Sequence, residues 1–134
     1  MMRYLVAYLA AGIAFLAIDS IWLMTMADLL YRPLLGDILN ESFNVVPAVL
    51  FYFIYIGGIV IFAVRPALAS GRWTTAALFG ALFGFCAYAT YDLTNQATIR
   101  NWPVLITVAD LFWGTLLTAT SATAGFSATK RFIR

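Results

Sequence analysis

Four long apolar runs constrain this chain more than any other feature of its sequence. Each run is about 20 residues long, the length that an α-helix needs to cross a bilayer core roughly 30 Å thick. The 134 residues are 63% hydrophobic and only 10% charged, whereas a soluble domain has about 25% charged residues. The sequence therefore predicts an all-α integral membrane four-helix bundle, and little chain is left over for a soluble domain.

The ends of the runs predict the helix boundaries. We expect one transmembrane domain, 1–134, with helices at residues 4–27, 45–64, 73–97 and 103–127. Arg65-Pro66 predicts the end of the second helix, because the residue before a proline disfavours helical backbone. The first run also has the position of a signal peptide. It is too long for one, contains Asp19 and lacks a small-residue cleavage site, so we expect a spanning helix.

The segment between the first two helices, residues 28–44, is predicted to be an outer loop. Its sequence, "DLLYRPLLGDILNESFN", alternates charged residues with Leu and Ile. This pattern fits a plain connection, a short amphipathic helix on the membrane surface or a lid over the helix ends. The sequence leaves these alternatives open.

The basic residues predict the orientation in the membrane. One face has no acidic residue and six basic ones, Arg3, Arg65, Arg72, Lys130, Arg131 and Arg134. The opposite face mixes signs, with Arg32, Arg100, Asp28, Asp37 and Glu41. Because basic loops remain in the cytoplasm, we expect both termini to be cytoplasmic and residues 28–44 to lie outside.

Composition also excludes several functions. The chain has no His and a single cysteine, Cys86. Haem held by His, a His-bound zinc site and Ser-His or Cys-His catalytic pairs are therefore excluded. We expect neither a metal nor a cofactor. A net charge of +2 and the lack of a phosphate-binding Gly loop argue against a nucleic-acid partner.

Three of the six acidic residues fall inside or at the end of apolar runs: Asp19, Asp92 and Asp110. At 1.5 Å per residue, Asp19 and Asp110 each lie roughly 12 Å below the outer face. Asp92 lies near the outer end of the third helix. All three are thus expected in the outer half of the membrane.

Helical spacing predicts that these acids face the bundle interior. Asp92 shares one face of the third helix with Gly80, Gly84, Tyr88 and Asn95, at spacings of three or four. Small residues on such a face allow close packing of another helix. Asp110 lies on a similar small and polar stripe of the fourth helix. We therefore expect a shared polar site, with candidate ligand-binding residues Asp19, Trp22, Tyr88, Asp92, Asn95, Arg100, Asp110 and Trp113.

The cost of intramembrane charge supports this hypothesis. An ionised Asp at mid-membrane costs about 2.5–3.5 kcal/mol on insertion scales, so the acids should be protonated, paired or hydrated. Arg100 is the expected counter-charge, and close carboxylates can share protons as a coupled group. Trp22 and Trp113 each follow an Asp by three residues and could wall the site or simply pack. The alternative is that the polar residues only join helices, at about 0.6 kcal/mol each.

Four segments carry a resemblance to a known family: "AIDSIWL", "AVLFYFIYIGGIVIFAV", "YDLTNQATIRNWP" and "ADLFWG". They resemble the domain of unknown function 2177 family, small bacterial membrane proteins with four helices. The resemblance covers nearly the whole chain. It implies four spans in a bacterial inner membrane, and it carries no substrate, reaction or catalytic residue.

Three functions remain open from the sequence. The first is binding or transport of a cation, proton or small polar molecule, with a homodimer helping to enclose the path. The face that carries Gly80 and Gly84 is one candidate dimer contact, and packing of that face inside the bundle is the alternative. The second is a membrane enzyme acting on a lipid, in which Asp92 or Asp110 is the general acid or base and Arg100 holds the head group. The third is an accessory subunit of a larger membrane complex. Whether the protein is an enzyme is undecided at this point.

Overall fold

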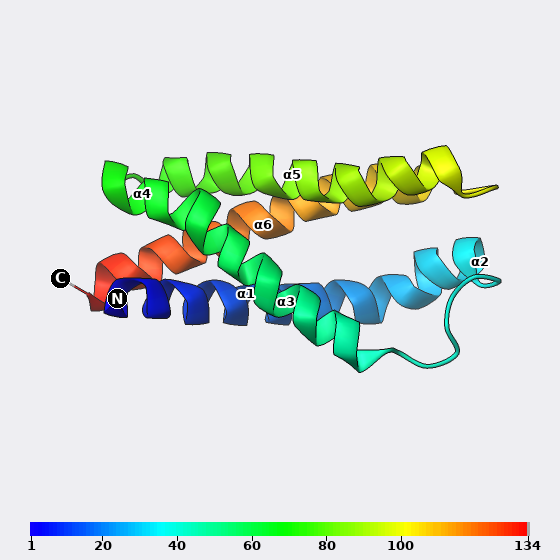
Figure 1. Cartoon of the computed structure of the whole chain (residues 1–134), viewed down its shortest axis with the longest axis horizontal. Coiled ribbons are helices and arrows are strands. Elements are labelled where there is room, and N and C mark those ends of the chain that lie inside the picture. Colours follow the sequence, from blue (N-terminus) through cyan, green and yellow to red (C-terminus); the bar gives the residue numbers. More distant parts are fainter. Residues whose placement is uncertain (134) are drawn as a thin grey trace.

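The fold is described from a computed structural model, which describes residues 1–133; Arg134, one of the six basic residues of the predicted inner face, lies outside the described residues. Residues 1–133 contain helices and no strand. Four continuous helical stretches are long and apolar enough to cross a membrane: Met2–Leu35, Val45–Ser70, Trp73–Thr98 and Val104–Phe132. The predicted all-α membrane bundle is thus confirmed. The first helical stretch begins, and the last one ends, at the same end of the bundle (Figure 1); the cytoplasmic location of both termini stays a prediction.

The first helical stretch extends beyond the boundary expected at residue 27. Helix α1 (Met2–Met26) continues through a π-helical turn, η1 (Ala27–Tyr31), into the short α2 (Arg32–Leu35). Half of the expected outer loop is therefore helical, and only residues 36–44 are irregular. Burial explains the extension, because Leu35 packs against Trp102 and Ile106, near the start of the fourth helical stretch.

The second stretch also passes the boundary that Pro66 predicts. Helix α3 (Val45–Ile59) leads into a second π-helical turn, η2 (Val60–Val64), and then into α4 (Arg65–Ser70). Each π turn immediately precedes an Arg-Pro pair, and the Arg N–H bonds five residues back, Arg65 to Val60 and Arg32 to Ala27. A proline ring clashes with the carbonyl four residues before it. The wider turn displaces that carbonyl, so the chain stays helical through the proline.

The remaining two helices lie close to their expected positions. A left-handed Gly71, with φ +72°, turns the chain from α4 into α5 (Trp73–Thr98). Asn101 also has positive φ in the short connection to α6. Helix α6 (Val104–Phe132) ends five residues later than the expected 127.

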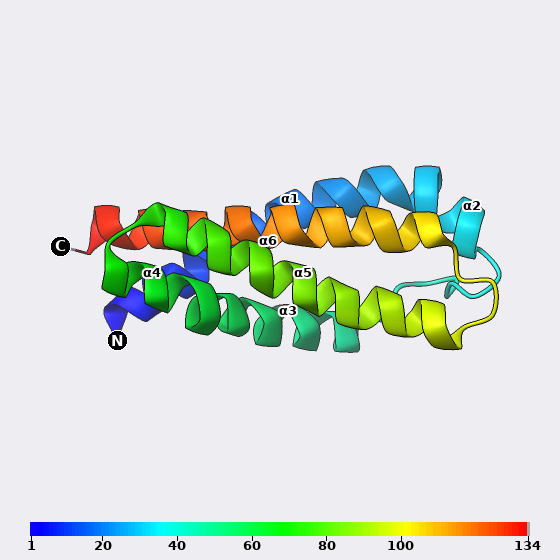
Figure 2. The same cartoon turned by 90° about the horizontal axis from the view of Figure 1, so that it is seen from above.

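Helix α6 is the central element of the bundle and packs against both α1 and α5 (Figure 2). The α5–α6 contact is close because glycines line it. A Cβ on Gly84 would lie 2.2 Å from the Gly114 carbonyl oxygen, and one on Gly80 would lie 2.9 Å from Cα of Ala119. The Gly80–Gly84 face is therefore occupied inside the bundle. It is not available as the dimer contact that the sequence suggested.

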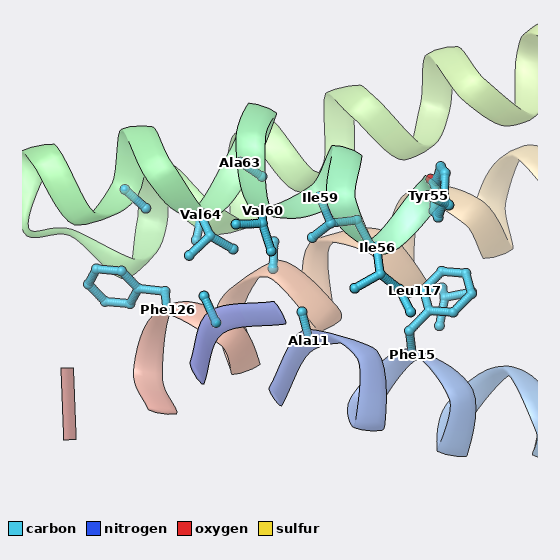
Figure 3. Packing of buried hydrophobic residues seen from close by; sticks show 14 residues of the cluster. Ala11, Phe15, Tyr55, Ile56, Ile59, Val60, Ala63, Val64, Leu117 and Phe126 are labelled. Carbon is cyan, nitrogen blue, oxygen red and sulfur yellow. The ribbon is translucent and has the colours of Figure 1, made fainter. Parts of the chain in front are cut away.

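The apolar core lies at the end of the bundle that holds the termini. Side chains from η2 and the neighbouring turn of α3 point towards α1 and α6 (Figure 3). Phe15 and Ile59 are fully buried there, and Val64 is as well. This core fixes α3 at one end only.

Beyond the core, α3 diverges from α5. Its η2 continuation packs against α5, whereas α3 itself packs mainly against α1. Figure 1 shows α3 crossing the bundle obliquely towards its start at Val45. The stacked rings of Tyr55 and Phe83, 5.0 Å apart, lie where the two helices separate. The divergence leaves space between the N-terminal half of α3 and the C-terminal half of α5.

Candidate functional site

A cavity of about 360 Å³ occupies the space between α1, α3, α5 and α6. Its wall carries two carboxylates, Asp19 and Asp110, and is otherwise mostly aromatic. The lining residues are Asp19, Trp22, Leu23, Tyr31, Phe43, Ala48, Phe51, Tyr52, Tyr55, Ala87, Tyr88, Tyr91, Asp110 and Trp113. Five of the eight predicted site residues are among them.

Asp19 of α1 is held by two aromatic donors from different helices. The Tyr52 hydroxyl of α3 donates to Oδ2 at 2.9 Å, and the Trp113 indole Nε1 of α6 donates to Oδ1 at 3.2 Å. The residue is buried. Its carboxylate therefore joins three helices, and both oxygens have a fixed partner. Hydrogen bonds to an ionised acceptor are stronger than neutral ones, so the two donors offset part of the cost that burial adds to a charged carboxylate.

Asp110 of α6 is the second carboxylate of the wall, and η1 supplies its partner. The Tyr31 hydroxyl donates to Asp110 Oδ1, while the Trp22 indole Nε1 donates to the Tyr31 oxygen at 3.1 Å. Tyr31 reaches the cavity because the helix continues past residue 27 through the π turn. The helical extension thus forms part of the cavity wall, at the η1 end of the site.

The two tryptophans that follow Asp19 and Asp110 in sequence form a stacked pair. The rings of Trp22 and Trp113 lie 4.3 Å apart and nearly parallel, at 8°. Each indole N–H points to a different polar partner, Tyr31 for Trp22 and Asp19 for Trp113. Each Trp follows its Asp by three residues, and the two indoles stack to form one part of the cavity wall.

Asp92 of α5 does not line the cavity. It is completely buried, and within residues 1–133 neither carboxyl oxygen has a hydrogen-bond donor. Asp110 of α6 is close enough to interact with it electrostatically. Two ionised carboxylates cannot hydrogen-bond one another, because both only accept. A proton on one of the two carboxyl groups would remove the repulsion between them.

The other two predicted residues are not brought to the cavity. Asn95 is half-buried on α5 and is absent from the lining. Arg100 is exposed, because α5 ends at Thr98 and the connection to α6 lies outside the bundle. The one ion pair within residues 1–133 joins Arg32 to Asp28 on the surface. Arg100 therefore does not act as the expected counter-charge in this structure.

Tyr31, Tyr52 and Tyr55 line the cavity and were missed by sequence reasoning. Tyr55 is buried and shares a hydrogen bond of 2.7 Å with the Thr118 hydroxyl. Tyr52 and Tyr55 are three residues apart in an otherwise apolar run, hence on one helix face. A phenol in a membrane span needs a polar partner. That requirement was the available signal for these residues.

Residues 1–133 contain no group of three His, Cys, Asp or Glu side chains spaced to hold one metal ion. The acids instead form two separate arrangements, Asp19 with its two donors and Asp110 beside Asp92. Charge in this cavity thus comes from separated carboxylates within an aromatic wall.

These features define a small helical membrane protein with polar side chains gathered between its helices. The chain belongs to the family described as "Predicted membrane protein (DUF2177)", whose sequence pattern matches residues 4–127. The resemblance inferred from the four motifs is confirmed, and the protein accordingly sits in a lipid bilayer. No curated protein and no solved structure matches the chain.

Proposed function

We propose that this protein binds a small cation-bearing ligand in the cavity, within the outer half of a bacterial inner membrane. One observation carries the proposal. Asp19 and Asp110 line the same cavity, and neither pairs with a Lys or Arg within residues 1–133. A bound cation would supply the charge that the wall lacks.

The energetics favour such a ligand. An ionised carboxylate at mid-membrane costs about 2.5–3.5 kcal/mol when it has no partner. The hydroxyl and indole donors reduce this cost without neutralising the charge. A purely structural role explains the arrangement less well, because amides would join the helices without the ionic desolvation cost.

Thermal unfolding of the purified protein in detergent tests the proposal. The probes are Na⁺, Mg²⁺, ammonium, tetramethylammonium and choline, each added as its chloride. A ligand at 100 times its Kd stabilises the folded state by about 2.7 kcal/mol, so at least one cation should raise the Tm of the wild type. Asp19→Asn and Asp110→Asn should each abolish that shift.

Asp28→Asn is the matched control, because it removes the same charge from an exposed side chain outside the cavity. It should keep the wild-type response. If none of the five cations stabilises the wild type, or if both cavity variants respond as the wild type does, the proposed function is wrong.

A further inference from the structure

We infer that the ligand is an alkylated ammonium, a cation whose nitrogen carries methyl or larger alkyl groups in place of most N–H donors. This inference rests on the proposed function and names the chemical class of ligand for the same cavity. It is carried by the aromatic wall, by the hydrogen bonds already made to the carboxylates and by the size of the cavity.

The wall is the first observation. Nine of the fourteen lining residues are aromatic: Trp22, Tyr31, Phe43, Phe51, Tyr52, Tyr55, Tyr88, Tyr91 and Trp113. Aromatic faces attract cations electrostatically, most strongly where water is excluded, and cages of such rings recognise quaternary ammonium groups. An alkylated ammonium also has apolar surface that these rings can bury.

The carboxylates provide the second observation. Both oxygens of Asp19 already accept a hydrogen bond from the wall, at 2.9 and 3.2 Å. Asp110 Oδ1 accepts one from Tyr31. These carboxylates therefore offer a ligand their negative charge, but few vacant positions that could accept a hydrogen bond from it. A cation with few or no N–H donors matches that supply better than a strongly hydrogen-bonding one.

Cavity size is the third observation. A volume of about 360 Å³ lies within the range of about 300–1,000 Å³ that small organic ligands occupy. A bare Ca²⁺ would need six to eight oxygen ligands, and aromatic carbons cannot supply them. Both size and lining thus favour an organic cation over a metal ion.

The opening of the cavity bears on where the ligand comes from. Phe51 of α3 and Tyr91 of α5 are exposed lining residues on the two diverging helices, and Phe43 is exposed in the loop. In a bilayer, a gap between two spanning helices is open to lipid. A soluble quaternary ammonium and the head group of a choline phospholipid present the same alkylated nitrogen to this opening.

Isothermal titration calorimetry of the detergent-purified protein tests the inference. Tetramethylammonium and choline should bind at least tenfold more tightly than ammonium or Na⁺. Trp22→Leu should weaken choline binding about tenfold, the size of a desolvated cation–π contact. Phe112→Leu is the matched control, since Phe112 is exposed on α6 and outside the lining, and it should bind choline as the wild type does.

A second aromatic substitution keeps the inference testable if the Trp22→Leu variant misfolds. Phe51 is 45% exposed, so Phe51→Leu should leave the fold intact and weaken choline binding about threefold. Unchanged choline affinity in a folded Trp22→Leu or Phe51→Leu protein would overturn the aromatic recognition. Asp19-dependent binding of Na⁺ or ammonium as tight as that of choline would also overturn it while leaving the proposed function intact. If no cation binds in a manner that depends on Asp19 or Asp110, both proposals are wrong.

Vesicles distinguish the two sources of the ammonium group. The protein is reconstituted into phosphatidylglycerol vesicles with or without phosphatidylcholine, and choline binding is measured in each. Weaker apparent binding in the phosphatidylcholine vesicles supports a lipid head group as the ligand, through competition. Equal binding supports a soluble ammonium compound.

Discussion

Tyr31 is the residue on which the η1 end of the cavity depends. Its hydroxyl accepts from Trp22 and donates to Asp110, so it connects η1 to both α1 and α6. A hydrogen bond to a charged group contributes about 1.5–3 kcal/mol. We expect Tyr31→Phe to lower the free energy of unfolding by that amount, measured by denaturant titration in detergent. Tyr8→Phe is the control, because Tyr8 donates to a neutral backbone carbonyl, that of Phe53.

The Tyr8→Phe change should cost about 0.5–1.5 kcal/mol, as expected for a neutral hydrogen bond. If both tyrosine variants lose the same small amount of stability, the hydrogen bond from Tyr31 to Asp110 contributes no more to the free energy of unfolding than a neutral one.

A substitution at Asp92 is expected to change the free energy of unfolding in the opposite direction. Within the described residues Asp92 is fully buried without a donor, and Asp110 is an acidic neighbour. Asp92→Asn keeps the shape of the side chain and is neutral without taking up a proton, so it removes the repulsion with Asp110. We therefore expect this substitution to raise the free energy of unfolding by about 1 kcal/mol at neutral pH, measured as a higher Tm. A Tm below that of the wild type would show that the buried acid stabilises the pair.

At the scale of elements, the sequence predicted some helix faces and not others. Spacings of three and four placed Asp19, Asp92 and Asp110 on interior faces, and all three are buried. The course of α3 could not be predicted from its sequence. It depends on the π turn η2, which keeps the chain helical through Pro66, and on packing of η2 against α5. Periodicity within one apolar run contains no information on such tertiary contacts.

The contact between α5 and α6 gives the element-scale prediction. In Gly84→Ala, the new Cβ would lie 2.2 Å from the Gly114 carbonyl oxygen, so the helices must move apart. We expect a loss of about 1–3 kcal/mol in unfolding free energy, typical of overpacking. Gly57→Ala is the matched control, because nothing lies within 4 Å of its new Cβ. Its stability should equal or exceed the wild type.

Thermal unfolding of the two alanine variants in the same detergent measures their stability. Equal stability of the two would contradict the close α5–α6 contact. A loss confined to Gly84→Ala would support it and would show that the candidate site is held by backbone packing beneath it.

For the whole molecule, we expect both termini and the α4–α5 connection to be cytoplasmic. The basis is the charge asymmetry of the chain, since basic loops stay inside. In a background with Cys86→Ala, cysteines are introduced at Ser42 and Ser70, which are both exposed and lie in the α2–α3 loop and at the end of α4. A membrane-impermeant thiol reagent should label intact cells at residue 42 only. Labelling at residue 70 alone would show that the protein has the opposite orientation in the membrane.

The stacked indoles of Trp22 and Trp113 should also give the protein an intrinsic circular dichroism signal that reports on its conformation. Two identical chromophores 4.3 Å apart couple their electronic transitions, and a coupled pair in a chiral setting gives a paired positive and negative band in circular dichroism. The signal depends on the relative position of α1 and α6, which carry the two rings. It should vanish in Trp22→Phe and in Trp113→Phe alike and persist in Trp73→Phe, whose ring lies exposed on α5. Any event that separates the helices at the cavity would thus become visible in the absence of label or ligand.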